Sequence, residues 1–101
     1  MRILVFFDLP TESRENRRDY AAFRKFLIKS GFMMVQESVY CKLALNQTVV
    51  SAIAENIRKN RPPKGVVQLL TITEKQYSKM EFITGTNVGD IITSDERFVE
   101  L

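Results

Sequence analysis

The sequence predicts an α+β fold, because segments with helical periodicity lie between short apolar segments typical of strands. Residues 3–7 are an unbroken apolar run that ends at Asp8, and a run this short indicates a strand buried on both faces. Residues 66–72 form another apolar run, rich in β-branched side chains. Two amphipathic helices between these runs complete the prediction.

The first helix is expected to begin at Thr11, a suitable N-cap, with Glu12 and Glu15 in a first turn where the helix dipole favours negative charge. Gly31 is a natural stop after about five turns. Apolar side chains recur at helical spacing along one face: Tyr20, Phe23, Phe26 and Leu27. The opposite face is basic and carries Arg17, Arg18, Arg24, Lys25 and Lys29.

Two strands, or one long strand with a bend, are expected at 32–36 and 39–43. The second alternates between two faces, with Cys41 on one and Tyr40 and Lys42 on the other. Asn46 then caps a second helix that ends in a basic run before two prolines.

The strand at 66–72 leads into Thr73, which resembles the start of a capped turn, and residues 80–83 are expected to form a further short strand. The order β-α-β-β-α-β, with extra β-strand toward the C-terminus, predicts a ferredoxin-like sandwich. In such a sandwich an antiparallel sheet carries two helices on one face.

The other face of the sheet needs a cover, and a homodimer through that face provides one, with the C-terminal strand completing the partner's sheet. Met33 and Met34 are expected to pack in the core or in this interface. We expect one domain, 1–101, in which 85–101 is an extension that contacts the second copy or another partner.

Charge is divided unevenly along the chain, whose net charge is +3. Residues 1–65 hold 12 Lys/Arg and 6 Asp/Glu, whereas residues 66–101 hold 3 and 6. This division predicts a basic surface for a polyanion such as nucleic acid and an acidic C-terminal segment with another role.

The sequence contains no histidine and one cysteine. Histidine-activated nucleophiles and a structural zinc site are therefore excluded. Cys41 is expected to be an inert buried thiol in a reducing compartment. No stretch has the roughly 20 apolar residues that span a bilayer, so we expect a cytoplasmic protein.

Asp8 is the first candidate site residue, because it stands where a buried strand leaves the core, close in sequence to a group of arginines. It is a candidate ligand for Mg²⁺ or Mn²⁺, hard ions that take carboxylate oxygens. One carboxylate makes a poor site, but two copies of Asp8 near a dimer axis could share an ion that activates water against a phosphodiester. The alternative is a strand-end aspartate that accepts nearby backbone N–H groups.

Basic side chains are the second candidate group, expected to bind the phosphates of a nucleic acid with little sequence specificity. They are Arg14, Arg17, Arg18, Lys42, Arg58, Lys59, Arg61 and Lys64. The alternative is a solvated helix face with pairing between neighbouring charges. Ser38 and Tyr40 are weaker candidates for contacting a phosphate or donating a proton, and both residue types are commoner as a turn serine and a half-buried strand tyrosine.

Several short motifs together resemble one family. They are Phe6-Phe7-Asp8-Leu9-Pro10, Phe23-Arg24-Lys25-Phe26-Leu27, Ser30-Gly31-Phe32, Gln36-Glu37-Ser38-Val39-Tyr40 and Pro62-Pro63-Lys64-Gly65. Their order resembles the small, non-integrase subunit of the CRISPR adaptation machinery, the second of the universal CRISPR-associated proteins.

The resemblance implies a ferredoxin-like homodimer that bridges dimers of the CRISPR integrase subunit and holds double-stranded DNA. It also implies that Asp8 is the metal-binding, catalytic residue of a Mg²⁺-dependent endonuclease acting on DNA or RNA. The integrase is expected to dock on the acidic end of the chain, which carries Asp90, Asp95, Glu96 and Glu100. Two alternatives stay open: a purely structural DNA-binding scaffold, and a stand-alone toxin-like ribonuclease.

Overall fold

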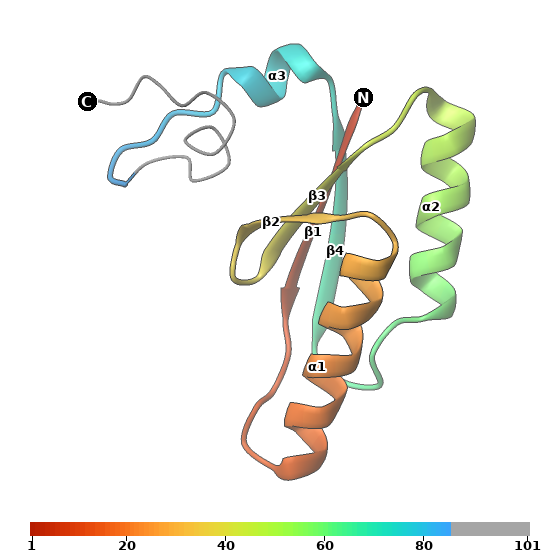
Figure 1. Cartoon of the computed structure of the whole chain (residues 1–101), viewed down its shortest axis with the longest axis vertical. Coiled ribbons are helices and arrows are strands. Elements are labelled where there is room, and N and C mark those ends of the chain that lie inside the picture. The colour runs from red at the N-terminus through yellow and green to blue at the C-terminus, as the bar shows by residue number, and fades with distance from the viewer. Residues whose placement is uncertain (86–101) are drawn as a thin grey trace.

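A computed structural model describes residues 1–85 as one four-stranded antiparallel sheet with helices packed on it (Figure 1). The elements in chain order are β1 (Arg2–Asp8), α1 (Arg14–Lys29), β2 (Met33–Gln36), β3 (Val39–Leu43), α2 (Gln47–Lys59), β4 (Val66–Ile72) and α3 (Glu74–Ser78). The strand order in the sheet is β2-β3-β1-β4. The predicted β-α-β-β-α-β order and the α+β, ferredoxin-like class are confirmed.

The first helix begins later than the sequence indicated. Its N-cap is Ser13 rather than Thr11, because the Ser13 hydroxyl accepts from the Asn16 N–H while the Asn16 side chain accepts from the Ser13 N–H. This reciprocal capping box outcompetes a lone threonine two residues earlier. The helix therefore spans 16 residues, about four and a half turns rather than five.

The end of α1 is the one predicted. Gly31 has a φ of +93°, which glycine adopts without strain, and the Phe32 N–H reaches back to the Leu27 carbonyl at 3.0 Å. The chain then turns sharply into β2. The second helix also starts as predicted, since the Asn46 side chain accepts from the Val49 N–H.

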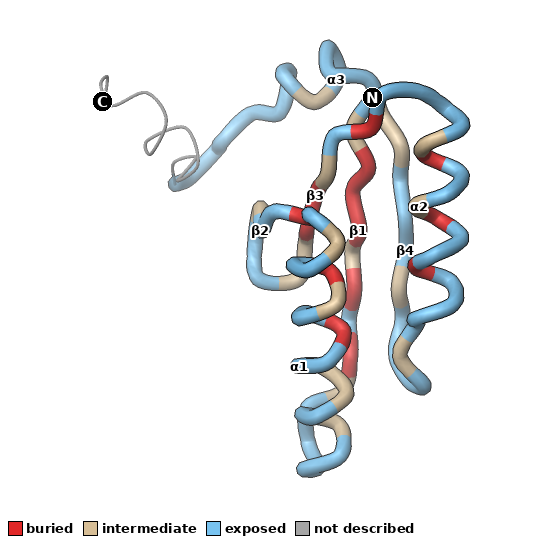
Figure 2. The backbone as a smooth tube through the Cα atoms, turned by 45° about the vertical axis from the view of Figure 1, so that its right-hand side comes forward, coloured by how far each residue is buried: buried red, intermediate tan, exposed pale blue. Residues whose placement is uncertain are grey.

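The core lies between α1, α2 and one face of the sheet (Figure 2). Ile3 and Val5 of β1 are fully buried there, and Phe7 is 4 % exposed. The Phe7 ring meets Phe23 edge-on at 5.4 Å and lies 5.6 Å from Tyr40. Such aromatic contacts add to the hydrophobic burial that holds both helices on this face.

Tyr40 is fully buried in this core, not half-buried as one interpretation of the sequence held. It alternates with Cys41, which is 1 % exposed on the opposite face of the sheet, so the expected burial of the thiol is confirmed. The predicted alternation of β3 is therefore right, but both of its faces take up apolar or aromatic side chains.

We call the face of the sheet that α1 and α2 leave uncovered the open face. Strand alternation and the pairing register place Leu4, Phe6, Met33 and Leu70 on it. Met33 and Leu70 are 62 % and 50 % exposed. The expectation that Met33 and Met34 pack in the core is wrong for a single chain, because β2 lies at the edge of the sheet and Met34 is also exposed.

After β4 the chain forms α3, whose capping box joins Thr73 and Gln76 as the sequence indicated. The expected strand at 80–83 is absent: these residues are irregular, and Ile83 is 83 % exposed. A strand needs a hydrogen-bonding neighbour, and residues 1–85 provide none for this segment. The C-terminal strand and the docking extension lie outside the described residues. Within the described part of the chain, no helix is long and apolar enough to cross a membrane.

Candidate functional site

Asp8 ends β1 and is exposed to solvent. Its pairing partner is Val66 at the start of β4, and alternation from Leu4 and Phe6 places its side chain on the open face. The carboxylate therefore stands at the rim of an apolar surface, where the buried strand emerges from the core as the sequence predicted.

Two loops meet the chain at this strand end. The Phe7 N–H donates to the Ser38 carbonyl at 3.1 Å, which places the turn between β2 and β3 beside the end of β1. Gly65, with a φ of +95°, lies against the next residues: a Cβ on it would be 2.7 Å from the Asp8 carbonyl oxygen. Only glycine permits this approach, so the loop between α2 and β4 is fitted closely around Asp8.

A single chain does not by itself fit a divalent metal. Among residues 1–85, no group of three or more His, Cys, Asp or Glu side chains could hold an ion. Asp8 stands as one carboxylate at this strand end, whereas Mg²⁺ and Mn²⁺ sites in proteins usually combine one or two carboxylates with waters and substrate phosphates. Any metal site at Asp8 needs a second molecule.

The outer face of α1 carries a row of cations. Arg14, Arg18, Lys25 and Lys29 are all exposed, and their four- and seven-residue spacing puts them on one side of the helix. We call these four residues the α1 basic row. At a rise of 1.5 Å per residue it extends over roughly 22 Å, with the guanidinium and ammonium groups directed away from the core.

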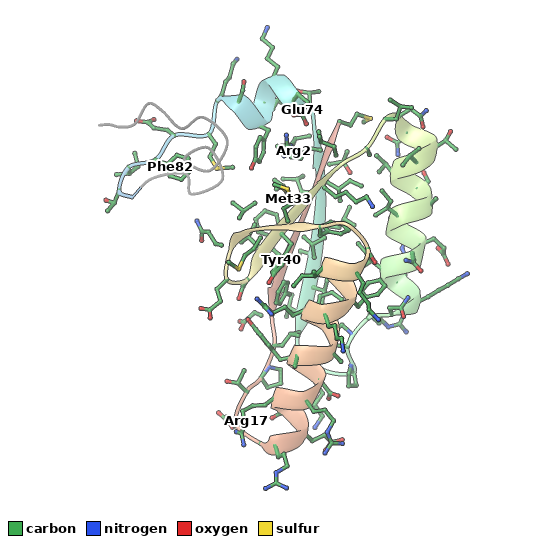
Figure 3. The ribbon with its side chains drawn as sticks, viewed as in Figure 1. Arg2, Arg17, Met33, Tyr40, Glu74 and Phe82 are labelled. Carbon is green, nitrogen blue, oxygen red and sulfur yellow. The ribbon has the colours of Figure 1, made fainter. Side chains whose placement is uncertain are left out.

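Arg17 makes contacts within the chain. Its guanidinium donates to the carbonyls of Thr11 and Glu12, both at 3.2 Å, and so braces the loop between β1 and α1 (Figure 3). Part of its hydrogen-bonding capacity is thus engaged within the chain. The residue as a whole stays exposed to solvent.

The remaining predicted cations lie outside α1. Arg58 pairs with Glu55 at 3.0 Å, and Arg61 donates to the Arg58 carbonyl at 3.3 Å. Lys42 donates to the Ser30 carbonyl at the end of α1, a typical contact for a lysine near a helix C-terminus. Lys59 and Lys64 are exposed. The α1 basic row is therefore the largest aligned set of cations in the described part of the chain.

Of the two weaker candidates, Ser38 lies at the site and Tyr40 does not. Ser38 is in the turn beside Phe7, as predicted for a turn serine. The Tyr40 hydroxyl is buried without a hydrogen-bond partner, so it cannot contact a phosphate at the surface. Strand alternation explains the correction, since Tyr40 pairs with Val5 and shares its core-facing side.

A cluster at the other end of β1 could not be read from the sequence. Arg2 makes a bidentate ion pair with Glu74, at 2.6 and 3.0 Å, and its guanidinium lies 4.0 Å from the centre of the Tyr77 ring. One of its nitrogens is 3.5 Å from the Cys41 sulfur. These hydrogen bonds hold the pKa of Glu74 below its ordinary value and raise that of Arg2. The partners are 72 residues apart, so no local motif joins them.

Comparisons with known proteins agree on one family. The model of the family described as CRISPR associated protein Cas2 matches residues 1–80. A protein of Treponema denticola named CRISPR-associated endoribonuclease Cas2 is 55 % identical over 101 residues, covering all of both chains. One of the same name from Streptococcus mutans is 45 % identical and covers all of this chain and 93 % of its own.

The fold is also similar to a solved structure. The crystal structure of Streptococcus pyogenes Cas2 at pH 6.5 superposes with a TM-score of 0.62 at 16 % identity, and the match covers 83 % of this chain and all of that one. This likeness agrees with the ferredoxin-like architecture built above.

Proposed function

The chain belongs to the Cas2 family of CRISPR-associated proteins, and from this premise we propose a homodimeric subunit of CRISPR adaptation that binds nucleic acid and hydrolyses phosphodiesters with a divalent metal. The observation that carries the proposal is the position of Asp8, an exposed carboxylate at the rim of the open face. Three features support it in turn: the open face, the paired carboxylates and the α1 basic row.

The open face is the proposed dimer interface. Its exposed apolar side chains include Met33, Leu43, Val66 and Leu70, each at least half exposed in the single chain. Exposed apolar side chains gathered on one face of a sheet are typical of a protein–protein contact. A two-fold dimer buries the same patch of both copies against itself, which needs no other partner.

Dimerisation through this face brings a second Asp8 to the same interface. The two carboxylates together supply the anionic oxygens that one chain lacks, and the residues of a dimer then fit Mg²⁺ or Mn²⁺ better than those of one chain. When bound, the ion would activate water and neutralise charge developing on the phosphate. The cytoplasm is the proposed compartment, since the single cysteine is a buried free thiol.

Phosphate binding is assigned to the α1 basic row, with Lys59, Arg61 and Lys64 as further cations. Duplex DNA is the proposed physiological ligand, bound through its backbone with little base readout. The CRISPR integrase is the proposed protein partner, docked on the acidic residues of the C-terminal segment beyond the described part of the chain. Deleting residues 90–101 should abolish the complex with the integrase; a complex that survives the deletion contradicts this docking site.

RNA is the second candidate substrate, because the relatives named above are called endoribonucleases. A stand-alone ribonuclease would cut single-stranded RNA without any partner protein. A pure scaffold, the remaining alternative, would bind DNA and cleave nothing.

The deciding experiment compares the wild type with Asp8→Ala on labelled duplex DNA and on single-stranded RNA, each with Mg²⁺, Mn²⁺ or EDTA. We expect metal-dependent cleavage that Asp8→Ala abolishes and an affinity for duplex DNA that it leaves unchanged. Glu12→Ala is the matched control, since it removes another exposed carboxylate from the same loop region. Binding without cleavage by both proteins would favour the scaffold.

A further inference from the structure

A pocket of about 210 Å³ lies between α1 and the end of α2, and Asp8 is not among its lining residues. Its apolar wall includes Phe26 and Pro63, and its polar groups come from Asp19, Asn60 and Arg61. Phe26 is half-buried and forms an offset stack with Phe23, with ring centres 6.1 Å apart and planes 29° apart. The pocket thus combines aromatic and proline surface with a few hydrogen-bonding groups, as small-molecule sites do.

The polar groups of the pocket are mostly acceptors. The Asn60 amide nitrogen already donates to Asn56, at 2.8 Å to its carbonyl, which leaves the Asn60 side-chain oxygen as the acceptor. The Asp19 carboxylate has no hydrogen bond or ion pair within residues 1–85. One guanidinium nitrogen of Arg61 donates to the Arg58 carbonyl, and the other N–H groups of Arg61 can still donate to a ligand.

The pocket adjoins the α1 basic row. Ala22 lines it and is exposed, and on a helix Ala22 neighbours both Arg18, four residues before it, and Lys25, three residues after it. A single nucleic-acid strand whose phosphates contact Arg18 and Lys25 would therefore have its bases next to the opening of the pocket.

We propose that this pocket receives one unpaired nucleobase of a single strand held by the α1 basic row. The proposal rests on the nucleic-acid binding proposed above and names a subsite for it. A base stacked beside Phe26 and Pro63 presents its polar edge to Asp19, Asn60 and Arg61. Two acceptors and one donor complement a base with an exocyclic amino group beside an acceptor, as in cytosine, better than uracil or thymine.

The test is a fluorescence-anisotropy titration of the full chain with a short labelled oligouridylate whose central position is cytidine, uridine or abasic. The wild type should bind the cytidine strand about fivefold or more tightly than the abasic strand, since stacking of one base is worth that much or more. The uridine strand should lie between the two. A deoxyribose series with cytosine, thymine or abasic positions shows whether the subsite acts on DNA, RNA or both.

Two variants with matched controls assign the effect to the pocket. Ala22→Leu fills the pocket from an exposed helical position and should remove the difference between cytidine and abasic strands, whereas Ala52→Leu, at an exposed position of α2 outside the pocket, should keep it. Asp19→Ala should remove the preference for cytidine over uridine. Glu15→Ala makes the same charge change on α1 outside the pocket and should retain that preference.

Equal affinity of the wild type for cytidine and abasic strands, with salt-dependent binding still present, would overturn the subsite and leave the proposed phosphate binding intact. If no single strand binds at all, the subsite fails, and a titration with duplex DNA then decides whether the proposed duplex binding stands. A base preference that Ala22→Leu leaves unchanged would place the base elsewhere on the protein and also overturn the proposal.

Discussion

The two faces of the sheet differ in whether helices of the same chain cover them. On the covered face, Ile3, Val5 and Phe7 are at most 4 % exposed because α1 and α2 of the same chain pack on them. On the open face, Met33 and Leu70 keep half or more of their surface exposed. Both faces are built by the same strands with side chains of similar hydrophobicity.

This difference shows that the hydrophobicity of a residue does not tell which element, of the same chain or of another, covers its side chain. Phe6 and Phe7 are adjacent in β1 and chemically identical, yet only Phe7 reaches the core. The open face is also not uniform: near Arg2 and Tyr77, Cys41 is almost fully buried, whereas Val66 beside Asp8 is 54 % exposed. Exposure on the open face therefore varies from residue to residue, and Leu43, which pairs with Arg2, is 59 % exposed.

The largest expected effect comes from Phe7→Ala. It should lower the free energy of unfolding by about 3–5 kcal/mol, because it removes a buried ring and leaves a cavity among Phe23, Tyr20 and Tyr40. Urea denaturation followed by circular dichroism measures the loss. Phe6→Ala is the matched control and should cost clearly less; equal costs would mean that the two faces are packed alike.

The next effect is on association. Leu70→Glu places a carboxylate in the middle of the exposed apolar patch, and burying it unpaired in an interface should weaken a dimer by about tenfold or more in Kd. Analytical ultracentrifugation over a concentration series measures this, and the circular dichroism spectrum should stay that of the folded chain. A dimer that tolerates the change would contradict the proposed use of the open face.

A smaller effect on stability is expected from a buried residue of the covered face. The Tyr40 hydroxyl is buried without a partner, so Tyr40→Phe should be neutral or should raise the free energy of unfolding by up to about 1 kcal/mol. Thermal denaturation compares the two proteins. A clear loss of stability would show that the hydroxyl is satisfied, for example by a buried water.

The smallest effect concerns the Arg2–Glu74 pair beside the open face. Because the pKa of Glu74 is lowered in the folded chain, its contribution to stability is present above the ordinary glutamate pKa and is lost as the pH falls through the lowered value. Glu74→Gln should therefore be slightly less stable than wild type at neutral pH and equal to it in acid. Melting temperatures at several pH values test this, and a difference that persists in acid would assign the effect to packing.

Local features of the sequence were enough for most elements. Periodicity and capping residues gave both long helices, and the strand at 66–72 was predicted with its observed bounds. The errors at Thr11 and at residues 80–83 have different origins. The cap at Ser13 is set by a local motif with Asn16 that lies in the sequence, whereas the absence of a strand at 80–83 depends on a pairing partner that no local pattern contains. For the same reason the sequence located Asp8 at a strand end but not the close approach of Gly65 to it.

The sequence by itself determined the element order, the uneven charge, the lack of histidine and a basic face on the first helix, because each of these is a property of residue type and spacing. Only the tertiary structure decided which face of each strand is covered. It buried Tyr40, left Met33 exposed and engaged Arg17 with loop carbonyls. It also joined Arg2 to Glu74 and opened the pocket between Asp19 and Asn60. These outcomes depend on contacts between residues far apart in the chain. Such contacts form only when the helices pack on one particular face of the sheet.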